Sequence, residues 1–237
     1  MWHVALNISF FEERGIHNTL TNISLFLTTE GRNFLQHSLI LMGEIGGNDY
    51  NYPLERGKSL QVTQLFGTAI VDSIGSAIQL GAKTILVPGN FPIGCIPTFL
   101  TKFEKSSSKK DYDSTTGYLN WLNKLSIYHN ELLQKELTRV QKLHPYVHII
   151  YADYYNVALR LYFSPTYKDI LRACCGAGGP YNFNDLVRCG QPGATCCNDP
   201  STFTTQGLLQ GPYTTPGFKD ICPSIAISSP AAQVYEY

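Results

Sequence analysis

The sequence has no excess of charge of either sign and no long apolar run. Lys and Arg together number 18, and so do Asp and Glu, so no net charge draws the chain to nucleic acid or to an acidic membrane. No apolar stretch reaches the roughly 18–20 residues that a membrane-spanning helix needs. The basic cluster Lys102–Lys110 is interrupted by Glu104 and three serines, a pattern that predicts a solvated loop. Neither nucleic acid nor a membrane span is therefore expected.

The sequence also lacks the short motifs of several enzyme classes. It contains no G-x-S-x-G elbow, no Gly-Asp-Ser, and no Asp three residues before any of its six histidines. The glycines Gly43, Gly46 and Gly47 do not have the spacing of a dinucleotide-binding turn, and no metal-ligand cluster is present, so no cofactor is expected. His129 and His144 fall on a long amphipathic segment, where we expect solvated or helix-capping roles.

Cysteine is not scarce, and its distribution is uneven. Six of the seven cysteines follow residue 170, namely Cys174, Cys175, Cys189, Cys196, Cys197 and Cys222. Clustering beside Gly and Pro favours a loop tied by disulfides, with the first five as candidates, and implies an oxidising compartment. Free thiols and a zinc site are the alternatives, although paired C-x-x-C knuckles are missing. The first 15 residues make a poor signal peptide, which points instead to the cytoplasm.

Apolar patterns predict strands and helices in alternation. Short buried strands are expected at Leu39–Gly43, Thr84–Val87 and Val147–Tyr151. Helices are expected at Ser59–Leu80, Thr116–His144 and Asn156–Phe163, while segment 164–237 is rich in Cys, Gly and Pro and shows little periodicity. This order favours one α/β domain over residues 1–237, a three-layer sandwich with a mostly parallel sheet.

Ligand sites in such sheets lie at the carboxyl ends of the strands. Three loops meet that edge here: Gly46–Tyr50, Gly89–Pro97 and Asp153–Tyr155. In the first, Gly46-Gly47-Asn48-Asp49 lets the backbone turn tightly, and the Asn48 amide is a donor that could face a developing oxyanion. An ordinary turn is the alternative, because Asn, Asp and Gly favour turns.

Several long strings resemble the plant GDSL esterase/lipase family of SGNH hydrolases, most closely its acetylajmalan-esterase and sinapine-esterase branch. They include SFFEERGIHN (residues 9–18), LMGEIGGNDYNYPL (41–54), LVPGNFPIGCIPTFLT (86–101) and RACCGAGGPYNFN (172–184). The resemblance implies a secreted α/β hydrolase in which a serine attacks a small acyl ester. It also implies that Asn48 is an oxyanion-hole donor, with Gly46, Gly47 and Asp49 completing its motif.

The departures from the family bear on activity. The serine motif has no counterpart, and Trp2-His3-Val4-Ala5 stands where an oxyanion glycine is expected. Phe203 joins Gly207 almost directly, where the family has its Asp-x-x-His motif. The resemblance therefore implies an ester hydrolase that is catalytically deficient as this chain, with a non-catalytic ester-binding or decoy protein, or a non-functional truncated product, as the alternatives. Missing strands also predict an unpaired edge at Leu39–Gly43 or its neighbour.

Overall fold

The computed structural model describes residues 2–5, 29, 33, 36–41, 47–58, 83–165, 167, 169–187 and 191–198. The chain divides into two compact units. The first is Met1–Phe91 with Lys124–Asn156, and the second is Pro92–Asn123 with Val157–Tyr237. The helix expected at Ser59–Leu80 lies outside the described residues, and one domain over residues 1–237 stays a prediction.

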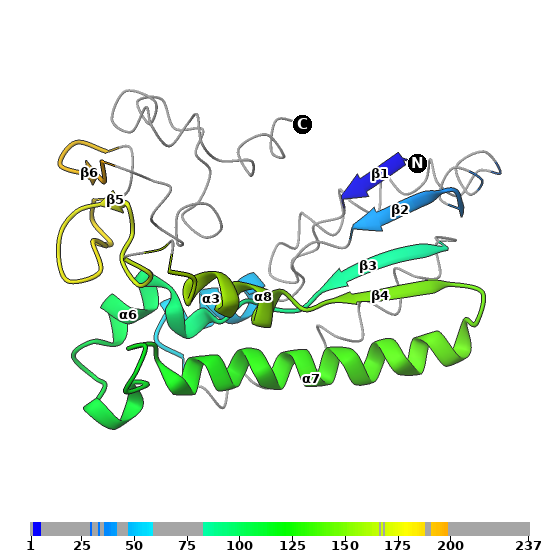
Figure 1. Cartoon of the computed structure of the whole chain (residues 1–237), viewed down its shortest axis with the longest axis horizontal. Helices are drawn as coiled ribbons and strands as arrows, with labels where there is room; N and C mark the ends of the chain where they lie inside the picture. Colours follow the sequence, from blue (N-terminus) through cyan, green and yellow to red (C-terminus); the bar gives the residue numbers. More distant parts are fainter. Residues whose placement is uncertain are drawn as a thin grey trace. The chain divides into compact units, whose positions relative to one another are not determined.

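A four-stranded parallel sheet forms the centre of the first unit (Figure 1). Strands β1 (Trp2–Ala5), β2 (Ser38–Leu41), β3 (Thr84–Pro88) and β4 (His148–Ala152) lie side by side in that order, and every neighbouring pair is parallel. The predicted α/β fold with a mostly parallel sheet is thus confirmed. The three expected strands are found close to their predicted bounds.

Strand β1 was not among the expected strands. It pairs with β2 along its whole length, with Trp2 opposite Ser38 and Ala5 opposite Leu41. Because β3 flanks β2 on the other side, β2 has a parallel partner on both sides. The predicted loss of a partner therefore does not fall on β2; within the described sheet, β1 and β4 are the outer strands.

Helix α3 (Gly47–Glu55) corrects the expectation of a turn after β2. Tyr50, Pro53 and Leu54 are spaced to lie on one helical face, and Tyr50 and Leu54 are almost completely buried. Burial of this face outweighs the turn preference of Gly-Asn-Asp and the missing N–H of Pro53, which sits inside the helix. The Asn48 motif consequently begins a helix.

Helix α7 (Asn120–Leu143) runs alongside the strands (Figure 1). The prediction of a long helix here is confirmed, but it begins four residues later than expected. Gly117 adopts a left-handed backbone with φ 76°, which interrupts helix formation, and Pro145 follows the end. The buried apolar side chains of α7 in the first unit include Leu133, Leu137 and Val140.

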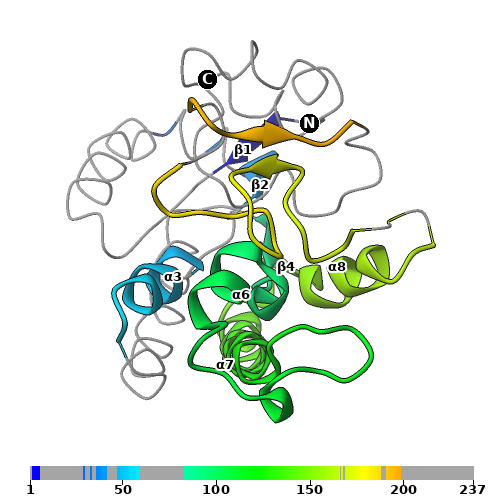
Figure 2. The ribbon, with the colours of Figure 1, turned by 90° about the vertical axis from the view of Figure 1, so that its left-hand side faces the viewer.

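The second unit contains mostly short elements. They are η2 (Ile93–Cys95), α6 (Pro97–Phe103), η3 (Lys109–Asp111), β5 (Cys175–Gly176) and β6 (Thr195–Cys196). Strands β5 and β6 form an antiparallel pair, the yellow and orange arrows of Figure 2. Helix α8 (Tyr154–Tyr162) has residues in both units and matches the short helix predicted there. Of the solvated loop predicted at Lys102–Lys110, residues 104–110 are largely exposed, whereas Lys102 and Phe103 form the end of α6 and are half-buried.

Candidate active-site edge

The carboxyl ends of β2, β3 and β4 lie along one edge of the first unit's sheet, because the strands are parallel. After β2 the chain reaches the Asn48 motif, and after β3 it reaches Gly89 and Asn90. Gly46 lies outside the described residues. Gly47, Asn48 and Asp49 occupy the first turn of α3, where Gly47 and Asp49 are buried. The role of Asn48 as an oxyanion donor stays a prediction.

Tyr50 ties this first turn to α7. Its hydroxyl lies 2.9 Å from Nδ1 of His129, and the two rings meet edge to face with centroids 5.2 Å apart. Both side chains are fully buried. The expectation that His129 is solvated or caps the helix is wrong, because its position four residues from both Leu125 and Leu133 puts it on the buried face.

Burial decides the protonation state of this pair. It lowers the pKa of His129 to about 4, so the imidazole is neutral at pH 7. Burial also raises the pKa of the Tyr50 phenol, with smaller contributions from Tyr128 and Asp49. Nε2 of His129 has no hydrogen-bond partner among the described residues. A neutral imidazole shut away from solvent is poorly placed to take a proton from a water molecule.

The Tyr50–His129 contact is one polar clamp between α7 and this edge, and a second clamp holds the turn after β3. The N–H of Asn90 donates to Oδ1 of Asn130 at 2.6 Å, and Nδ2 of Asn130 donates back to the Asn90 carbonyl at 3.1 Å. Gly89 adds a hydrogen bond from its own N–H to the carbonyl of Ala152, next in the sheet. The main chain of this turn is therefore fixed from both α7 and β4.

Asn90 keeps its side-chain amide unused within this fixed turn. The residue is 1% exposed, and neither Nδ2 nor Oδ1 has a partner in the described part of the chain. Gly89 beside it is closely surrounded: a Cβ there would collide with the Tyr151 hydroxyl and stand 2.9 Å from Oδ1 of Asn130. Burial raises the pKa of Tyr151 to about 12, so its hydroxyl stays protonated.

No group of three or more His, Cys, Asp or Glu that could hold a metal occurs among the described residues. Nor does any helix in the described ranges have the length and apolar character to cross a membrane. The polar groups described at this edge are amides, the Tyr50 and Tyr151 phenols, a neutral imidazole and the buried carboxyl group of Asp49. The amides, phenols and imidazole donate and accept hydrogen bonds, and the carboxyl group accepts them.

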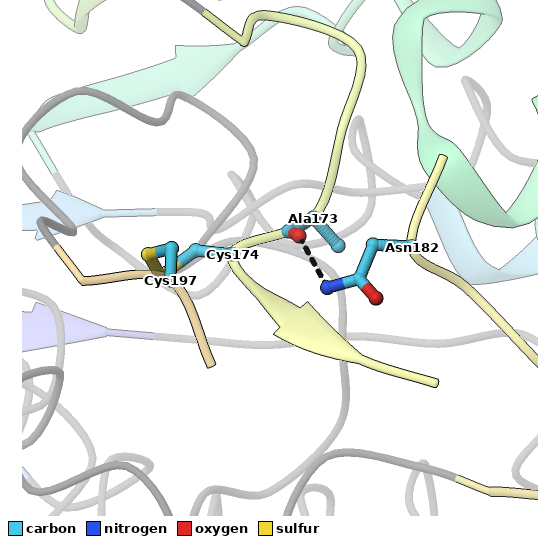
Figure 3. Close-up of a disulfide and its surroundings, with 4 residues drawn as sticks. All are labelled: Ala173, Cys174, Asn182 and Cys197. Atoms are coloured by element: carbon cyan, nitrogen blue, oxygen red, sulfur yellow. Dashed lines mark hydrogen bonds between the residues drawn. A yellow bond between two sulfur atoms is a disulfide. The ribbon is translucent and has the colours of Figure 1, made fainter. Parts of the chain in front are cut away.

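The second unit contains the cysteine-rich loop. Cys174 and Cys197 form a disulfide with Cα atoms 4.7 Å apart, and Cys175 and Cys196 each take part in a disulfide as well. Asn182 braces the loop by donating through Nδ2 to the carbonyl of Ala173 at 2.9 Å (Figure 3). Cys189 lies outside the described residues. The remaining described cysteine, Cys95, is a buried free thiol.

Comparison with known proteins identifies a family for this chain. The family described as GDSL-like Lipase/Acylhydrolase matches residues 15–204. A GDSL esterase/lipase of Arabidopsis thaliana is 43% identical over 94% of this chain and 64% of its own length, and a second is 41% identical over 95% and 68%. Sinapine esterase of Brassica napus is 42% identical over 92% of this chain and 66% of its own length.

The chain thus spans about two thirds of the length of these relatives. The alignment with the first of them runs over 261 residues, which exceeds the 237 residues of this chain, so that relative has internal segments that are missing here. The matched residues 15–204 include strands β2 to β6, the Asn48 motif and the disulfide between Cys174 and Cys197. On this similarity the chain belongs to the GDSL-like lipase/acylhydrolase family.

Proposed function

We propose that this chain derives from a carboxylic ester hydrolase and retains its acyl-binding edge, but that these 237 residues alone do not turn over esters. The observation that supports this most is the Gly47-Asn48-Asp49 turn at the carboxyl edge of a parallel sheet. In acyl transfer, a donor at that place stabilises the negative charge that develops on the carbonyl oxygen.

The proposed deficiency follows from what ester hydrolysis needs. A nucleophile must attack the carbonyl carbon, and a base must take its proton. The sequence has neither Gly-Asp-Ser nor Asp-x-x-His, and the alignment with the 43% identical relative requires internal gaps in this chain. His129 does not substitute for the base, because it is buried, neutral and bonded to Tyr50.

The size of the expected defect is large. In a serine hydrolase, removal of the nucleophile or the base costs about 10⁶ in turnover, whereas the oxyanion hole and binding leave roughly 10³–10⁴ over water. One donor of a complete oxyanion hole contributes on the order of 10²–10³. Without a serine, no covalent intermediate forms, so the Asn48 amide should contribute little of this rate enhancement.

A non-catalytic ester-binding protein is the second candidate. The buried side-chain amide of Asn90, which has no partner among the described residues, favours it, because a polar group of this kind is normally satisfied by a partner. Since one relative is named sinapine esterase, sinapine is a reasonable ester to test beside simple acetates. The disulfides of the cysteine loop further support an oxidising, secretory location for this protein.

The test compares three purified proteins with p-nitrophenyl acetate and with sinapine: this chain, its Asn48→Ala variant, and a full-length relative as positive control. We expect turnover by the relative alone, with this chain and the variant both at background. Saturable binding of sinapine by the chain, weakened by Asn48→Ala, would favour the binding protein. Turnover well above background that falls with Asn48→Ala would refute the proposed deficiency.

A further inference from the structure

The two clamps at the acyl-binding edge come from adjacent residues of one helix. His129 binds Tyr50, two residues beyond Asn48 on α3, and Asn130 binds the main chain of Asn90. The strands that lead into these two turns, β2 and β3, are parallel neighbours. A single step along α7 therefore contacts both turns that border the edge.

We propose that His129 and Asn130 are positioning residues that fix the first turn of α3 and the Gly89–Asn90 turn in register with each other. This inference rests on the proposed acyl-binding role of the edge. Neither residue is proposed to touch a reacting atom. Each acts through its partner, because a donor for an oxyanion is effective only when its position is set before the charge develops.

Burial makes these contacts more than incidental. Tyr50, His129, Asn90 and Asn130 are all at most 5% exposed, so water does not compete for the hydrogen bonds. A phenol or a main-chain N–H that loses its partner there cannot form a hydrogen bond with water instead, so the loss destabilises the fold. The alternative is that both contacts only stabilise the first unit as a whole, as any buried hydrogen bond does.

Helix α7 offers a matched control for that alternative. Gln141 lies on the same helix and also bonds main chain: its Nε2 donates to the carbonyl of Val147 at 2.7 Å, and its Oε1 accepts from the N–H of Ile149 at 3.2 Å. These bonds hold the amino end of β4, at the opposite end of the strands. Loss of the Gln141 bonds should weaken the first unit without loosening the carboxyl edge.

The experiment is hydrogen exchange by mass spectrometry on the full chain, read in peptides covering Gly47–Glu55 and Gly89–Phe91. His129→Phe should speed exchange in the α3 peptide about tenfold, and Asn130→Leu should do so in the Gly89–Phe91 peptide. Gln141→Leu should leave the exchange rate of both peptides unchanged, when each protein is measured at the same number of degrees below its own melting temperature. His129→Asn, which keeps a polar group near Nδ1, should restore most of the protection.

Two results would overturn the inference. One is that Gln141→Leu speeds exchange in both peptides as much as the clamp variants do. The other is that His129→Phe and Asn130→Leu leave both peptides unchanged. If His129→Phe does not fold, Tyr50→Phe removes the same hydrogen bond from the other side and is read in the same way. No ester takes part in the measurement, so its outcome is separate from that of the proposed function.

Discussion

Replacing Gly89 by alanine tests how tightly the turn after β3 is built. The added Cβ collides with the Tyr151 hydroxyl and stands 2.9 Å from Oδ1 and 3.0 Å from Cγ of Asn130. Asn130 cannot move aside without giving up both hydrogen bonds to Asn90. Two such bonds at about 1 kcal/mol each, and about 1 kcal/mol of overpacking, give a loss of about 3 kcal/mol.

Urea denaturation measures this loss as a lower midpoint at an unchanged m-value. The melting temperature should fall by roughly 6–12 °C for a chain of this size. Gly89→Ala combined with Tyr151→Phe should recover part of the stability, because the colliding oxygen is removed. Gly57→Ala is the contrasting case: nothing lies within 4 Å of the new Cβ there, and its cost comes from φ 73°, a strain that Gly89 does not share. A Gly89→Ala protein within about 0.5 kcal/mol of wild type would refute the reasoning.

Three further predictions concern His129 and the cysteines. Because burial lowers the pKa of His129 to about 4 from 6.5, the unfolded chain binds the extra proton between these values, so stability should fall as pH drops from 6.5 to 4, by about 3 kcal/mol in total. In His129→Asn, denaturation curves measured across this pH range should no longer show this fall in the free energy of unfolding. Thiol counting on denatured, unreduced protein from an oxidising compartment should find one or three free thiols, and one fewer in Cys95→Ala; seven would contradict the disulfide loop. Replacing Cys174 and Cys197 by serine should cost about 3 kcal/mol in unfolding experiments, and an unchanged midpoint would show that this crosslink constrains little.

Local patterns predicted the strands well because each is a short apolar run bounded by a turn or a polar residue. They failed where distant contacts decide the structure. Residues 2–5 have no strong pattern of their own, and their strand exists through pairing with β2. In α3, the turn preference of Gly-Asn-Asp gave no hint that Tyr50 and Leu54 would bury one helical face.

The predicted role of the Asn48 motif stays a prediction, whereas its contacts with α7 could not be predicted from the sequence. The loops after the strands and the motif around Asn48 were visible in the sequence. The roles of His129 and Asn130 were missed because histidine and asparagine on a helix are usually assigned to solvent. The phase of α7 could have revealed His129, which falls between Leu125 and Leu133 on the apolar stripe. Its partner Tyr50 is 79 residues away, which no local pattern can supply.

The spacing of the contacts along α7 has a consequence for how this chain can change in length. From Asn130 to Gln141 there are eleven residues, about three helical turns and roughly 16 Å of rise. That distance matches the length of the five-residue strands β3 and β4, whose two ends these side chains hold. Inserting or deleting one residue between them would turn one contact about 100° away from the other. Substitutions in this stretch should be tolerated far better than any change in its length.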